Sequence, residues 1–113
     1  MYDQHLEERI TNLLDAKKII YEKKKMMGGL AFMVDRKMCV GIVKNDLMAR
    51  IGPDRYPMAL KKKGCKEMKF TGRPMLGYVF VEPVALDMDD QLAYWVQLCL
   101  DFNPLAIASK KKK

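Results

Sequence analysis

The sequence contains one serine, Ser109, and one histidine, His5, each close to an end of the 113-residue chain. A Ser-His-Asp triad within the folded body is therefore excluded, and a Cys-His pair would have to use His5. Cys39, Cys65 and Cys99 are odd in number and widely spaced, a pattern typical of reduced thiols and not of a disulfide framework. The sequence therefore predicts a protein without catalytic residues.

The chain also lacks the features of membrane, secreted and metal-binding proteins. No stretch approaches the roughly 20 apolar residues of a membrane-spanning helix. The acidic opening, with Asp3, Glu7 and Glu8, does not resemble a signal peptide. Cysteine, histidine and carboxylate residues do not cluster with metal-ligand spacing, and the glycine pairs lack the spacing of a phosphate loop. We therefore expect a cytoplasmic protein without membrane contact, metal or cofactor.

Positive charge is present but concentrated in short runs. The four lysines at 110–113 and the three at Lys23, Lys24 and Lys25 account for all seven net positive charges. A lysine run without interleaved aromatic residues attracts phosphate in a way that does not depend on sequence. Two interpretations stay open for these runs: a solvated helix end or tail, and a nonspecific nucleic-acid contact.

Hydrophobic periodicity predicts three helices and five strands. The first helix is expected over residues 3–22, the second over 54–63 with Asp54 as its N-cap, and the third between an N-cap at Asp87 and Asn103. The expected strands cover residues 28–34, 37–43, 47–51, 66–70 and 75–81. The order α-β-β-β-α-β-β-α indicates a two-layer α+β fold with an antiparallel sheet. We expect one domain over 1–104 and a disordered lysine-rich tail over 105–113.

The strands predict a sheet with two apolar faces, whereas a sheet packed on one side should be polar on the other. A two-residue turn at Asp35-Arg36 would place Met33 opposite Met38 and Phe32 opposite Cys39. The face on which we expect contact with a second copy then holds Met33, Met38, Val40 and Ile42. Since soluble monomers rarely expose such a patch, we expect a homodimer formed through the sheet. The alternative is that the short helix and the loops cover this face.

Two arginines are the strongest candidates for a binding site. Arg50 interrupts an apolar strand, and Arg73 stands in an expected turn beside Pro74. Arginine in such positions can bind a carboxylate or phosphate through two parallel hydrogen bonds. The alternative is a structural ion pair or a side chain that extends along the surface.

Five blocks of the chain together resemble the TfoX/Sxy N-terminal domain family: residues 27–34, 37–38, 46–50, 70–75 and 77–83. The resemblance runs from the first helix to about Asn103. Met27 stands where a phenylalanine is usual and Arg36 where a glycine is common, and these departures concern packing and turn geometry. The resemblance implies a two-layer fold similar to that of type III secretion chaperones and a tendency to dimerise.

The named members of that family are bacterial regulators of natural competence, thought to act as coactivators with the cyclic-AMP receptor protein. Those regulators carry a further C-terminal domain beyond the region of resemblance. We therefore expect a small non-enzymatic regulatory domain that binds a protein partner, with transcription regulation as the candidate process. The alternatives are nonspecific nucleic-acid binding through the lysine runs, and a small-ligand pocket or unrecognised enzyme that uses Arg50, Arg73 or the cysteines.

Overall fold

The computed structural model describes residues 2–26, 28–70 and 73–106, with side chains for all of these except 69–70 and 73–76. The strands are β1 (Glu22–Met26), β2 (Gly29–Val34), β3 (Lys37–Val43), β4 (Asp46–Arg50), β5 (Cys65–Phe70) and β6 (Arg73–Val81). The helices are α1 (Gln4–Ala16), α2 (Tyr56–Ala59) and α3 (Asp89–Phe102), with 3-10 turns η1 (Pro83–Ala85) and η2 (Asn103–Leu105). The chain order is therefore α-β-β-β-β-α-β-β-α.

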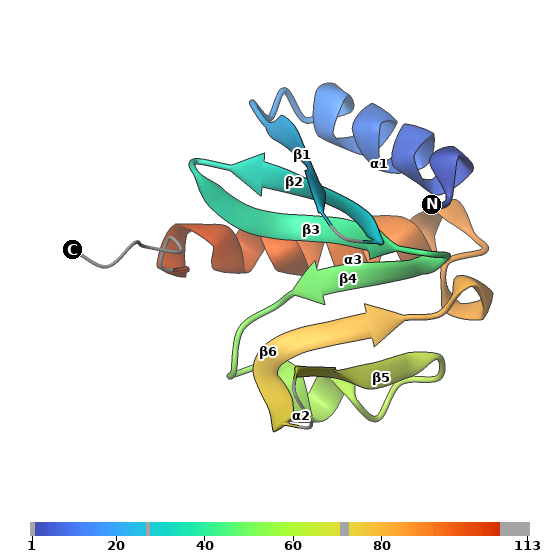
Figure 1. Cartoon of the computed structure of the whole chain (residues 1–113), viewed down its shortest axis with the longest axis vertical. Helices are drawn as coiled ribbons and strands as arrows, with labels where there is room; N and C mark the ends of the chain where they lie inside the picture. The colour runs from blue at the N-terminus through green and yellow to red at the C-terminus, as the bar shows by residue number, and fades with distance from the viewer. Residues whose placement is uncertain (1, 27, 71–72, 107–113) are drawn as a thin grey trace.

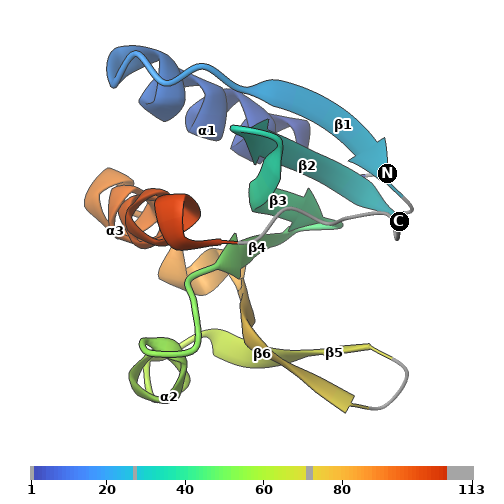
Figure 2. The same ribbon diagram turned by 90° about the vertical axis from the view of Figure 1, so that its left-hand side faces the viewer.

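The six strands form one antiparallel sheet in the order β1-β2-β3-β4-β6-β5. The three α-helices lie on the same side of this sheet (Figures 1 and 2), and no described helix lies over its other face. The prediction of a two-layer α+β fold with an antiparallel sheet is confirmed. The sheet has one strand more than expected.

The additional strand, β1, comes from the segment that was expected to end the first helix. α1 begins after Asp3, whose carboxylate accepts hydrogen bonds from the backbone N–H groups of His5 and Leu6, and it ends at Ala16. Lys18 then has a φ of 61°, which a continuing helix does not allow. Ile20 belonged to the expected apolar stripe, yet its side chain is 89% exposed. The apolar residues after Ala16 therefore continue the three- and four-residue spacing of a helix without being helical.

Three further boundaries differ from the predictions. α2 has four residues and follows Arg55, so Asp54 is not its N-cap. α3 follows Met88, whose backbone N–H donates to the side chain of Gln91 at 2.9 Å, so Asp87 is not its N-cap. Leu105 ends η2 and Ala106 is buried, so neither residue belongs to the disordered tail that was expected over 105–113. Residues 107–113 lie outside the described residues.

A β-bulge determines which side chains of the β2–β3 hairpin face the helices. Met33 lies opposite Met38 as expected, but a register shift between Phe32 and Met33 places Phe32 opposite Val40, not Cys39. Val40 and Ile42 therefore lie in the core under the helices, with exposed fractions of 0%. Their predicted place on a dimer face is wrong, because a period-two pattern does not reveal an inserted residue.

The core lies between the sheet and the helices. It combines apolar side chains of α1, α3 and the segment after β4 with those of the four central strands. Its largest fully buried members are Phe32, Ile10, Leu14, Ile42, Leu47, Ile51, Leu92, Val40, Val79, Val81 and Val96. Within the described residues, no helix is both long and apolar enough to span a membrane.

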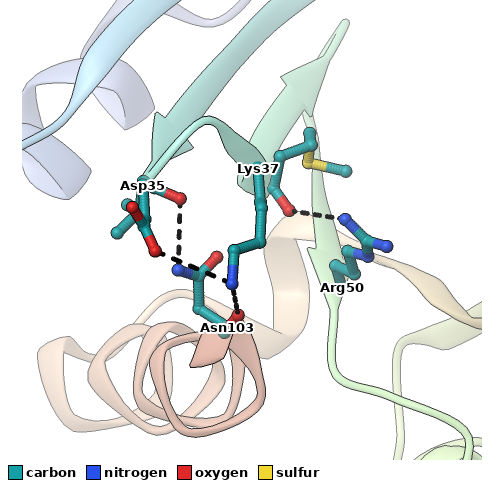
Figure 3. Close-up of polar contacts among 6 residues, drawn as sticks. Asp35, Lys37, Arg50 and Asn103 are labelled. Atoms are coloured by element: carbon teal, nitrogen blue, oxygen red, sulfur yellow. Dashed lines mark hydrogen bonds and ion pairs between the residues drawn. The ribbon is translucent and has the colours of Figure 1, made fainter. Parts of the chain in front are cut away.

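The β2–β3 turn is attached to the end of α3 (Figure 3). Lys37 Nζ donates to the backbone oxygen of Asn103 at 2.9 Å and lies 3.8 Å from the carboxylate of Asp35. The side-chain amide of the buried Asn103 donates to the backbone oxygen of Val34 at 3.1 Å. These bonds connect a hairpin tip to a helix terminus from the other end of the chain.

Within this turn, Asp35 and Arg36 have φ values of 56° and 66°. This is the left-handed region, which costs an L-residue about 1–2 kcal/mol and glycine much less. We expect Arg36→Gly to raise the free energy of unfolding by about 0.5–1 kcal/mol, as measured by urea denaturation. Arg36→Ala, which keeps the Cβ atom, is the matched control and should leave stability nearly unchanged. A less stable Arg36→Gly variant would contradict this account of the turn.

Candidate functional site

Arg50 is the last residue of β4, and its Cα lies opposite that of Tyr78 in β6. Its neighbours Ala49 and Ile51 are buried in the core, so strand alternation directs Arg50 toward the opposite, helix-free face. The half-buried side chain donates from Nη1 to the backbone oxygen of Met38 at 3.4 Å (Figure 3). Arg50 is therefore held at the end of the central strands.

Two aromatic rings flank the guanidinium group of Arg50. Its Cζ atom lies 5.3 Å from the ring centroid of Tyr78 and 5.9 Å from that of Phe102, at the end of α3. Both distances are within the range of cation–π attraction, which is about 6 Å. The N–H groups of the planar guanidinium point outward in its plane, and one of them, on Nη1, makes the hydrogen bond to Met38.

Arg50, Tyr78 and Phe102 line a pocket of about 360 Å³, which we call the Arg50 pocket. The remaining lining residues are Gly52, Pro53, Gly77 and Leu105. An adjoining hollow of about 190 Å³ shares Gly52, Pro53, Phe102 and Leu105 with it, and adds Ile51, Asp54, Arg55 and Asp101. In this hollow the guanidinium of Arg55 lies 3.8 Å from the carboxylate of Asp101.

Two glycines allow the pocket to form. The backbone N–H groups of Ile51 and Gly52 both donate to the oxygen of Gly77, at 2.8 and 3.1 Å. Gly52 and Gly77 have φ values of 90° and 89°, which L-residues rarely adopt. A Cβ atom on Gly52 would lie 2.4 Å from Cδ1 of Phe102, and one on Gly77 would lie 3.1 Å from the carbonyl carbon of Gly52. Larger residues would therefore displace this wall of the pocket.

The predicted lysine cluster forms part of β1, at one edge of the sheet. Lys23 Nζ lies 2.9 Å from the carboxylate of Glu7 and 5.8 Å from the ring centroid of Phe32. This hydrogen bond raises the pKa of Lys23 and lowers that of Glu7. Lys24 alternates to the helix-free face, opposite Ala31, and Lys25 lies opposite Leu30. Lysines are a common protection of edge strands against pairing with another chain.

The structure does not bring the candidate cations together. Arg50 and the lysines are separated in the sheet by β2 and β3. Arg73 is the first residue of β6, opposite Phe70, and its side chain lies outside the described set, as do residues 71–72 of the expected turn. Of these candidate cations, Arg50 is the one that lines the pocket described above, among the residues whose side chains are described.

The helix-free face of the sheet is apolar at its centre. Ala31 and Met48 are 3% and 2% exposed, although neither belongs to the core cluster under the helices. Met33 and Met38 lie opposite each other and are half-buried, as are Tyr78 and Phe80 of β6. This face carries Arg50 at one end, so it adjoins the Arg50 pocket.

The cysteines do not supply a nucleophile. Cys39 and Cys99 are each 1% exposed. Burial raises the pKa of Cys39 to about 12, that of the half-buried Cys65 to about 11, and that of Cys99 well above its ordinary value. The thiolate is the reactive form, so the raised pKa values lower the reactivity of all three thiols near neutral pH. Among the described residues, no three metal-ligating side chains cluster.

These pKa values give a prediction for thiol labelling. At pH 8 the native protein should react slowly with a thiol reagent, and Cys65 should react first because it is the least buried of the three. Its rate should rise about tenfold per pH unit up to pH 10, following the thiolate fraction. Mass spectrometry of the labelled peptides would identify the site, and unfolding in denaturant should expose all three thiols. Rapid native labelling of Cys39 or Cys99 would contradict the core packing.

Sequence reasoning singled out Arg50 but missed the residues around it. Tyr78 and Phe102 lie far from Arg50 in the chain, so only the pairing of β4 with β6 and the position of α3 bring them near it. Gly52 follows the expected strand over residues 47–51 and lies next to Gly77 in the structure. A close approach to Gly77 leaves no signal in a single sequence.

The family model described as the TfoX N-terminal domain matches residues 16–103 of the chain. The match includes every strand, α2 and α3, and all residues that line the Arg50 pocket except Leu105. No curated protein and no solved structure matches the chain.

Proposed function

The chain belongs to the TfoX N-terminal domain family, and on this basis we propose that it is a small, non-enzymatic regulatory domain that acts by binding a protein. The observation that carries the proposal is the position of all three α-helices on one side of the sheet, which leaves the other face without a helical layer. We place the domain in the cytoplasm and assign its regulatory role to transcription, in line with its resemblance to competence regulators.

The proposed contact surface is the helix-free face, with Met33, Met38, Tyr78 and Phe80 as its apolar members. Methionine adapts to irregular partner surfaces, and tyrosine and arginine are enriched in protein interfaces. We propose a second copy of the chain as the occupant of this face. Edge-to-edge pairing through β1 would bring Lys23, Lys24 and Lys25 of two copies together, and like charges oppose this arrangement. This favours contact through the helix-free face over pairing through β1.

A photo-crosslinking residue in place of Phe80 tests the surface in living cells. The half-buried Phe80 lies on the helix-free face, so we expect a crosslinked product with twice the mass of the chain. The same residue at Tyr94, which is exposed on α3 on the helix side, is the matched control and should give no such product. A crosslinked product of another mass from the Phe80 position would support protein binding through this face, but with a partner other than a second copy of the chain. No product from Phe80 would contradict the proposed surface.

The charge of the chain supports a second, weaker function, which is nonspecific nucleic-acid binding through the tail. The folded part is nearly neutral apart from the β1 lysines, and Lys23 is already paired with Glu7. Fluorescence anisotropy with a labelled DNA duplex should therefore detect salt-sensitive binding by the full chain and none by a chain that ends at Ala108. Micromolar binding by the shortened chain would instead assign a DNA contact to the folded domain.

A further inference from the structure

A hollow of about 440 Å³ lies between α3 and the turn that connects α2 to β5. We call it the Tyr94 hollow, and its lining residues are Lys62, Lys63, Ala85, Gln91, Tyr94 and Trp95. We propose that it binds a short acidic segment of a partner protein, with one aromatic or large apolar side chain of that segment inside the hollow. Tyr94 lies on the helix side of the sheet, so this site is separate from the contact proposed for the helix-free face.

The turn that carries the lysines is attached to the wall of the hollow. The backbone N–H of Glu82 donates to the oxygen of Gly64 at 2.7 Å, which joins the turn to the start of η1. Gly64 has a φ of 82°, and a Cβ atom on it would lie 2.8 Å from the Cβ atom of Ala85. The backbone N–H of Cys65 donates to the oxygen of Lys62 at 3.2 Å. The lysines are therefore presented from a backbone that is already ordered, which lowers the entropic cost of binding.

Three consecutive lysines determine the charge of the bound segment. Lys61, Lys62 and Lys63 are all exposed, and none of them forms an ion pair within the part of the chain that the structure describes. Lys62 Nζ lies 5.0 Å from the ring centroid of Tyr94. An ammonium group has three N–H donors, so contact with one ring leaves donors for a carboxylate. Acidic side chains are therefore the complement of this turn.

Exposed apolar side chains determine the rest of the segment. Trp95 is 3% exposed and forms the floor of the hollow, with the ring of Tyr94 edge-on to it at a centroid distance of 5.3 Å. Tyr94 is 43% exposed. Val84, next to Ala85, and Met88, at the start of α3, are 57% and 61% exposed. One aromatic or large apolar side chain placed here would cover this surface, as anchor residues do in protein interfaces.

The surroundings of the hollow favour a short peptide over a nucleic acid or a membrane. Asp89 and Asp90 lie in the first turn of α3, so an extended row of phosphates would meet carboxylates as well as lysines. A short peptide can instead place its acidic residues on the lysine turn alone. A flat lipid surface does not reach the buried Trp95, whereas a single side chain of a peptide can enter the hollow.

Trp95 is the single tryptophan of the chain, so its fluorescence reports occupation of the hollow. The full chain would be titrated with a capped peptide of two glutamates, one phenylalanine and two further glutamates. We expect a saturable change in Trp95 emission. A peptide with glutamine in place of glutamate, and one with serine in place of phenylalanine, should each bind about fivefold more weakly or less. No change in Trp95 emission, or equal binding of the three peptides, would overturn the proposal.

The chain offers a matched pair of charge variants, in each of which three exposed lysines are replaced by glutamine. The first variant combines Lys61→Gln, Lys62→Gln and Lys63→Gln, and the second combines Lys23→Gln, Lys24→Gln and Lys25→Gln. The first should weaken the glutamate peptide about fivefold or more, and the second should leave its affinity within about twofold. Circular dichroism would verify that both variants keep the fold. Equal weakening by the two variants would overturn the site, because it would indicate attraction to net charge alone.

Two further probes distinguish the proposed peptide from other anionic partners. A DNA duplex, or a vesicle of phosphatidylserine and phosphatidylcholine, should change Trp95 emission less than the peptide at the same concentration of negative charge. A larger change with either probe would assign the hollow to that partner and overturn the proposal. Neither readout involves the helix-free face, so a negative result here leaves the crosslinking result at the Phe80 position unaffected.

Discussion

The arrangement of the whole molecule depends on the contact between the end of β4 and the middle of β6. There the oxygen of Gly77 accepts hydrogen bonds from the backbone of both Ile51 and Gly52. β4 and β6 are not consecutive in the chain, so this contact joins the meander of the first four strands to the β5–β6 hairpin. It also directs the chain away from the sheet toward α2, and it places Arg50 beside Tyr78.

Much of the fold could be predicted because its signals are local. The turn at Asp35-Arg36, the strands that follow it and the apolar stripe of α3 are visible as short patterns, and the structure contains all of them. β1 was missed because Glu22–Met26 contains three consecutive lysines and one apolar residue, so neither strand nor core appears in its composition. β1 is a strand because it pairs with β2, and the sequence of β1 alone does not indicate this pairing.

The wrong prediction of the dimer face and the missed neighbours of Arg50 have a common origin. The β-bulge in the β2–β3 pair, at the register shift between Phe32 and Met33, places Val40 and Ile42 in the core and not on the expected dimer face. The partners of Arg50 likewise follow from strand order and from the position of α3. Contacts of this kind depend on the tertiary arrangement, which periodicity does not contain. Arg50 itself could be found, because it lies between the apolar residues Ala49 and Ile51 of an expected strand, and charged residues are rarely buried without a partner.

The pairing of β4 with β6 also has a consequence for the order of folding. The first four strands are connected by short turns, so they can pair while few residues separate them. β4 and β6 must instead close a loop that contains α2 and β5, and such long-range contacts form at a greater entropic cost. Arg50 and Tyr78 therefore meet only when both halves of the sheet have joined. A molecule that recognises their juxtaposition would distinguish finished chains from partly folded ones.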